Sequence, residues 1–184
     1  MGFLSILKYS IFITPIIIAI LLGYYHKKED FPLRTSIEIN KTTKEKVCGL
    51  LKDLEFLRFH PCVKELIFKK KTKTGNTTND IYEIREEAEV LMGLYKFKTK
   101  NLLYVEKIDD CKIKTHVKMP ILGLFEAEFT GLFYVKQLQK DSFLFVEEAN
   151  ISGIYYAIAV VREYTKFYHD ILFEKIKIYL ESQV

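Results

Sequence analysis

The chain has 184 residues, of which 49% are hydrophobic and 28% charged, and its formal net charge is +4. After an apolar N-terminal segment is set aside, enough residues remain for one globular domain with a real core. The basic charge is modest and spread over many segments, and no nucleic-acid-binding motif is present. Composition therefore argues against a nucleic-acid partner.

The apolar excess lies at the N-terminus. Lys8 is the only charged residue between Phe3 and Tyr25, and this run is long enough for one bilayer span. A cleaved signal peptide is the competing interpretation, but no small-residue cleavage pattern follows the run. We expect residues 1–28 to be an uncleaved transmembrane anchor, followed by a short linker over residues 29–34.

The sequence contains opposing signals for the side of the membrane on which the domain lies. Lys27, Lys28 and Arg34 follow the span, and only Lys8 and the amino terminus come before it, which favours a cytosolic domain. Three cysteines without a framework spacing also suit a reducing compartment. Against this, three of the five asparagines match the N-glycosylation acceptor pattern: Asn40, Asn76 and Asn150. We expect a single-pass membrane protein with a cytosolic domain.

The part after the linker, residues 35–184, begins with a strand and two short helices. Residues 35–40 alternate between polar and apolar, which predicts the strand. Thr42 or Thr43 can cap the helix that follows. A second short helix is expected over residues 55–60, ended by the proline that comes next.

Strand patterning dominates the middle of the chain. Residues 94–100 show it most cleanly, with lysines on one side and apolar or aromatic residues on the other. Segments containing Gly, Asn or Asp separate the apolar runs and predict turns. Six strands are predicted, over residues 63–71, 80–90, 94–108, 112–119, 124–138 and 142–151.

The last segment, from Ile154 to Ser182, is predicted to be one long amphipathic helix. Its apolar residues recur at steps of three and four, and neither proline nor glycine interrupts it. At about 1.5 Å per residue such a helix spans roughly 40 Å. An isolated helix of this kind is marginally stable, so we expect its apolar face to lie on the sheet.

The predicted order is strand, two short helices, six strands and a long helix, which indicates an α+β fold. Together with four local patterns it resembles the START/polyketide-cyclase (SRPBCC, helix-grip) superfamily, over about residue 34 to the C-terminus. Those patterns lie at residues 36–39, 46–54, 59–65 and 150–153. The resemblance implies a curved antiparallel sheet around the long C-terminal helix, with a cavity for an apolar ligand between them. None of the patterns is a catalytic signature, so no reaction is implied.

Alternation along the strands and the apolar face of the helix give candidate residues for lining this cavity. Strand residues with inward aromatic or branched side chains are expected to face the helix, and helix residues to face them. The candidates are Tyr95, Phe97, Val117, Phe129, Phe133, Val161, Thr165 and Tyr168.

No catalytic or metal-binding constellation is apparent, and we expect no cofactor. His60 is most simply a residue at a helix end, and His169 a partly buried surface residue. No pair of histidines has metal-ligand spacing with a third ligand nearby. Cys48, Cys62 and Cys111 are scattered and are expected to be small core or half-buried thiols.

These observations lead to a hypothesis of function and two alternatives. The leading hypothesis is a membrane-anchored module that binds or transfers a lipid or other apolar small molecule, and is not an enzyme. A cyclase or dehydratase of the same fold is the alternative, but it needs an acid or base inside the pocket. The inward strand faces offer mainly Tyr, Thr and apolar residues, which weighs against it. A third possibility is an adaptor whose cavity is filled by its own side chains.

Overall fold

The computed structural model describes residues 28–74, 77–90, 95–121 and 125–183. The expected anchor lies outside these residues except for Lys28, and the anchor remains a prediction. Within the described ranges, no helix has the length and apolar character needed to cross a bilayer.

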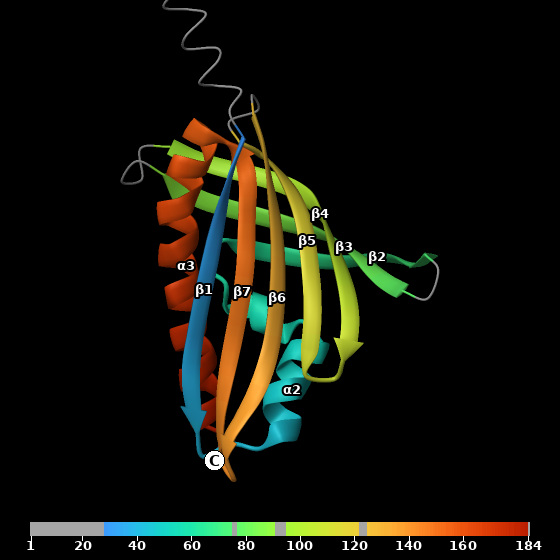
Figure 1. Cartoon of the computed structure of the whole chain (residues 1–184), viewed down its shortest axis with the longest axis vertical. Coiled ribbons are helices and arrows are strands. Elements are labelled where there is room, and N and C mark those ends of the chain that lie inside the picture. The colour runs from blue at the N-terminus through green and yellow to red at the C-terminus, as the bar shows by residue number, and fades with distance from the viewer. Residues whose placement is uncertain (1–27, 75–76, 91–94, 122–124, 184) are drawn as a thin grey trace, which may run out of the picture.

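In the described part of the chain, seven strands form one antiparallel sheet in the order β1-β7-β6-β5-β4-β3-β2. The last six strands follow one another as a meander, and β1 returns to the edge beside β7. Figure 1 shows β2 to β4 turned across the direction of β1, β7 and β6, so the sheet is strongly curved. The strands are β1 (Lys28–Asn40), β2 (Val63–Thr74), β3 (Thr77–Val90), β4 (Tyr95–Asp109), β5 (Lys112–Ile121), β6 (Phe125–Gln139) and β7 (Ser142–Ile154).

The first strand is longer than the sequence predicted. Residues 29–34, expected as a linker, are part of β1 and pair with β7, for example Pro32 with Asn150. Pro32 is tolerated because β1 is an edge strand, where a missing backbone N–H need not break a ladder. Phe31 and Leu33 continue the inward alternation of the strand, and Leu33 is buried.

The helices are α2 (Lys44–Lys52), the 3₁₀ helix η1 (Glu55–Phe59) and α3 (Tyr155–Glu181). The side chain of Thr43 caps α2 by accepting a hydrogen bond from the backbone N–H of Lys46 at 3.4 Å. α3 packs mainly along β1 and β7, as Figure 1 shows. The long C-terminal helix on a curved antiparallel sheet therefore agrees with the predicted α+β arrangement.

The core lies between the sheet and the helices. Phe145 of β7 meets Phe173 of α3 edge-to-face at 5.3 Å between ring centroids, and Phe133 of β6 contacts Phe56 of η1 at 4.9 Å. On α3 the residues Ile158, Leu172, Phe173, Ile176 and Leu180 are buried. Burial of these apolar side chains is the main force that holds helix and sheet together.

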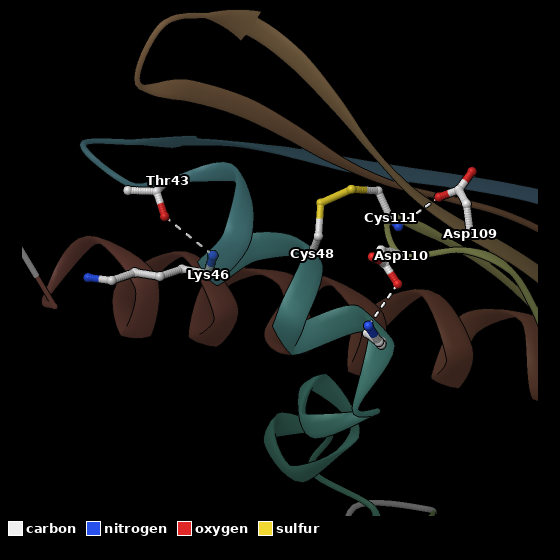
Figure 2. The surroundings of a disulfide bond; sticks show 7 residues. Thr43, Lys46, Cys48, Asp109, Asp110 and Cys111 are labelled. Carbon is white, nitrogen blue, oxygen red and sulfur yellow. Dashed lines mark hydrogen bonds and ion pairs between the residues drawn. A yellow bond between two sulfur atoms is a disulfide. The ribbon is translucent and has the colours of Figure 1, made fainter.

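A disulfide bond joins Cys48 of α2 to Cys111, which lies in the turn between β4 and β5 (Figure 2). The expectation of three free thiols is thus wrong for two of them, and Cys62 is the free, buried one. The two residues are 63 positions apart, but their Cα atoms lie at 4.6 Å, within the range that a disulfide requires. Lys52 and Asp110 form an ion pair of 2.8 Å next to this bond.

Candidate functional site

A buried carboxyl–imidazole pair lies between the sheet and α3. Nδ1 of His169, on α3, is 2.6 Å from Oε2 of Glu147, on β7. Glu147 is completely buried and His169 is 8% exposed. The second carboxyl oxygen of Glu147, Oε1, is also buried and finds no hydrogen-bond partner among the residues that the structure describes.

The strand register explains why Glu147 faces inward. In β7 the inward row runs through Phe143, Phe145, Glu147, Ala149 and Ile151, all of which are buried. Glu147 therefore lies in a row of otherwise apolar residues, while the next residue, Glu148, faces solvent. Alternate strand residues point to opposite faces, so one residue of the adjacent pair at 147 and 148 had to face the core. The adjacent glutamates in an alternating strand are thus a sequence signal for a buried carboxyl group, one that was not among the predicted site residues.

His60 lies beside this pair, just after η1. Its ring is 5.5 Å from that of His169 in an edge-to-face arrangement, and its Nδ1 accepts a hydrogen bond of 3.3 Å from the backbone N–H of Cys62. Burial lowers the pKa of His60 to about 3, and the charges of His169 and Lys175 add to this effect. His60 is therefore neutral near pH 7, and the proton of its ring is on Nε2.

Two further titratable groups complete the cluster. Burial is the main cause that raises the pKa of the Cys62 thiol to about 12, and the nearby carboxyl of Glu86 adds to it. Burial likewise raises the pKa of Glu86, on β3. Hydrogen bonds from Asn101 (3.3 Å) and Thr99 (3.4 Å) to Oε2 of Glu86 oppose that rise.

We use the term polar cluster for His60, Cys62, Glu86, Glu147, Tyr168 and His169. These residues come from the loop between η1 and β2, from β3, from β7 and from α3. Tyr168 hydrogen-bonds to the Cys62 side chain and opposes the rise in its pKa. The polar cluster thus joins segments that are distant in sequence, in the layer between sheet and helix where the cavity was predicted.

The expectation for His169 is wrong, because this residue is buried rather than partly exposed. His60 does lie at a helix end, as the C-cap of η1, and its ring also meets that of His169. The position of His169 was detectable from the sequence. It follows Thr165 by four residues and precedes Phe173 by four, so it lies on the same helix face as the buried part of α3.

The predicted cavity residues fall into groups. Phe129 contacts His169 edge-to-face at 5.8 Å, and Tyr168 belongs to the polar cluster. Val117 and Phe133 are buried, and Phe133 packs against the ring of Phe56 in the core. Val161 and Thr165 are half-buried on α3. The side chains of Tyr95 and Phe97 lie outside the described part of the structure. Their contact with a ligand remains a prediction.

An open hollow of about 480 Å³ lies on the other face of the sheet, lined by residues that include Pro32, Arg34, Leu132 and Asn150. Its charged residues are exposed, and Arg34 pairs with Glu148 at 3.6 Å. We assign the candidate site to the polar cluster, because there a buried carboxyl group meets a buried imidazole. In the described residues, no group of three or more His, Cys, Asp or Glu side chains is arranged to hold a metal ion.

No family model and no curated protein matches the sequence. Solved structures do match the fold. A START superfamily protein from Mycobacterium smegmatis aligns with a TM-score of 0.56 and 12% identity, over 83% of this chain and 99% of that one. A conserved protein from Geobacillus kaustophilus aligns with a TM-score of 0.57 and 15% identity, over 83% and 96% of the two chains. The chain has the START-type helix-grip fold.

Half of a two-domain protein shares this helix-grip fold. The aromatase/cyclase StfQ of the steffimycin biosynthetic pathway aligns with a TM-score of 0.58 and 11% identity, over 85% of this chain and 51% of that one. The helix-grip fold therefore occurs both in START proteins and in aromatase/cyclases. At such low identities the likeness shows the fold, while function has to be argued from the site.

Proposed function

We propose that this helix-grip domain binds an apolar small molecule that carries a hydrogen-bond donor, between the sheet and α3, and that residues 1–27 tether it to a membrane. The observation that carries the proposal is the unpartnered Oε1 of Glu147 in a fully buried position. The likeness to START and aromatase/cyclase structures supports a ligand-binding fold.

The energetic argument concerns that oxygen. A buried polar atom without a partner costs about 1–3 kcal/mol, and more if it is charged. A hydroxyl or amide N–H of a bound molecule would recover this free energy by donating to Oε1. The ring of Phe129 next to His169 offers apolar contact for the rest of the ligand. A lipid with a hydroxyl group, or a polycyclic molecule with one, fits both requirements.

The matched test uses two neighbouring glutamates on opposite faces of β7. In Glu147→Gln the amide oxygen can keep the hydrogen bond with His169, which leaves the NH₂ group facing the ligand donor. We expect about tenfold or greater loss of affinity for a hydroxyl-bearing fluorescent lipid, because 1.4 kcal/mol corresponds to a factor of ten. Glu148→Gln alters the exposed neighbour and should bind as the wild type does. Equal affinity of the two variants would contradict the proposal.

An enzyme is the second candidate, and one observation favours it. The carboxyl of Glu147 orients the imidazole of His169, as in sites where a carboxylate holds a general base. The inward strand faces were expected to offer mainly Tyr, Thr and apolar residues, but Glu147 and Glu86 add carboxyl groups to them. A cyclase or dehydratase would use this pair to remove a proton from a bound substrate and help water to leave.

The two candidates differ in the fate of the bound molecule. A binding module returns its ligand unchanged after hours of incubation, whereas a dehydratase or cyclase returns a product that has lost water. Mass spectrometry of the extracted small molecule distinguishes these results. His169→Asn should abolish any conversion if the imidazole is the base, and conversion that persists in this variant would exclude that role.

A further inference from the structure

The disulfide bond indicates the kind of compartment in which the domain folds. Cys48 and Cys111 come from different elements and form a bond in the structure. Such bonds persist in oxidising compartments and are rare where glutathione keeps thiols reduced. Besides the disulfide, Lys52 and Asp110 form an ion pair, and the Cys111 N–H donates to Oδ1 of Asp109 at 2.7 Å. Both contacts lie beside the cysteines of the bond (Figure 2).

The glycosylation acceptor patterns are a second and independent observation. Asn150, followed by Ile151 and Ser152, is exposed on the face of the sheet opposite to α3. Its Nδ2 donates a hydrogen bond of 3.3 Å to the exposed Asp30, and Asn150 lines the open hollow on this face. A sugar attached there meets solvent, while the intervening Ile151 remains buried in the core.

The other asparagines make poorer acceptors or lie outside the described residues. Asn40 is half-buried at the end of β1, and its backbone N–H donates to Glu181 at 2.9 Å. Asn101 is buried and lacks the pattern. Asn76 lies outside the described residues. Among the described asparagines that match the pattern, Asn150 is the exposed one.

The structure also weakens the charge argument for a cytosolic domain. Arg34 was counted as a residue flanking the membrane segment, but it lies within β1 and pairs with Glu148. Domains translocate largely regardless of their charge. Lys28 likewise lies in β1, so Lys27 alone remains on one side of the predicted span, against Lys8 and the amino terminus on the other. This balance no longer favours a cytosolic domain.

We propose that Asn150 carries an N-linked glycan and that the domain faces the lumen or the exterior, where the Cys48–Cys111 bond forms. In the glycosylation step, Nδ2 of Asn150 bonds to the anomeric carbon of a lipid-linked oligosaccharide. The bond from that carbon to the lipid pyrophosphate breaks, the pyrophosphate leaves with the electron pair, and the amide gives up one proton. In the oxidation step the two thiols lose two protons and two electrons, which reduce the disulfide of a thiol oxidoreductase to a dithiol.

The experiment expresses the full chain in eukaryotic cells that N-glycosylate and analyses peptides before and after treatment with peptide N-glycosidase. The peptide containing Asn150 should carry a glycan that the enzyme removes, with conversion of Asn150 to aspartate. Ser152→Ala and Asn150→Gln should lose the modification. Ser152→Thr, which keeps the acceptor pattern, and Asn79→Gln, which alters an asparagine without it, should retain the modification.

The thiols are read in the same sample. Alkylation of denatured protein without reductant should label Cys62 alone, and labelling after reduction should add Cys48 and Cys111. An unmodified Asn150 in the wild-type chain, including the case of a glycan only at Asn40 or Asn76, overturns the proposal. Labelling of Cys48 and Cys111 without reductant overturns it as well. Because the wild-type peptides decide the result, a variant that fails to fold does not affect it.

Discussion

At the scale of single residues, the site depends on polar side chains at inward positions that are otherwise occupied by apolar ones. Glu147 and His169 each occupy a position on an inward face, one in a strand and one in a helix. Periodicity could identify both faces from the sequence. It could not show that the two residues, 22 positions apart, meet at 2.6 Å, or that His60 joins them, because those contacts depend on how α3 crosses the sheet.

His60 should make stability depend on pH. Its pKa is about 3 in the folded protein and 6.5 in the unfolded one, so the unfolded chain binds more protons between these values. The free energy of unfolding should then rise with pH, by roughly 3 kcal/mol from pH 4 to 6.5 at about 1.36 kcal/mol per unit. Below about pH 3 this contribution becomes constant.

The test is urea denaturation of the wild type and of His60→Asn across this range. The variant should lose most of the rise in the free energy of unfolding. Glu86 acts in the opposite direction, since its raised pKa makes stability fall as pH rises above 4.5, and it is the same in both proteins. His116→Asn, at a half-exposed position on β5, is the control. A wild-type slope retained in His60→Asn would contradict the lowered pKa of His60 in the folded protein.

At the scale of elements, the sequence predicted the order of strands and helices well. Alternation and the long uninterrupted helix pattern are local signals, and they identified all seven strands and α3. The start of β1 was misplaced because proline and charged residues suggested a linker, although an edge strand tolerates them. The disulfide was missed because sequence spacing does not reveal that α2 packs beside the turn between β4 and β5.

The disulfide should contribute to the stability of the domain. It joins residues 63 positions apart, and the chain-entropy model gives about 4 kcal/mol for a loop of this length. Reduction, or the double substitution Cys48→Ala and Cys111→Ala, should lower the free energy of unfolding by about 2–5 kcal/mol in urea titrations. Reductant should have no such effect on the double variant. Identical midpoints of wild-type protein with and without reductant would contradict this prediction.

The packing of α3 on the sheet provides a further prediction. Val161 is half-buried and packs against the core, whereas Ile178 on the same helix is 65% exposed. Val161→Arg should place a charge in the layer between helix and sheet, so capture of an apolar ligand should fall sharply, with some loss of stability. Ile178→Arg should bind normally. Unchanged capture by folded Val161→Arg would favour an adaptor with a filled interior.

At the scale of the whole molecule, the chain combines a two-layer core, a disulfide bond within the domain and an apolar N-terminal segment. The segment precedes β1 directly, without the linker that the sequence predicted. If residues 1–27 cross the bilayer, the domain is held close to the lipid surface, where an apolar ligand can enter or leave. This placement suits a protein that takes its ligand from the membrane or delivers it there.

The anchor itself can be tested by extraction. The full chain should stay in the membrane pellet after treatment with alkaline carbonate, because a transmembrane helix resists it, whereas a peripheral protein is released. A known peripheral protein in the same sample is the control. Release of the chain with its N-terminus intact would exclude the anchor and leave the binding proposal unaffected.

Native mass spectrometry of the full chain in detergent, with identification of any bound small molecule, tests the central claim most directly. The account predicts one apolar molecule with a hydroxyl or amide donor per chain, retained by Glu148→Gln and lost from Glu147→Gln. A folded wild-type protein that carries no such molecule, even after incubation with a membrane lipid extract, would contradict the account.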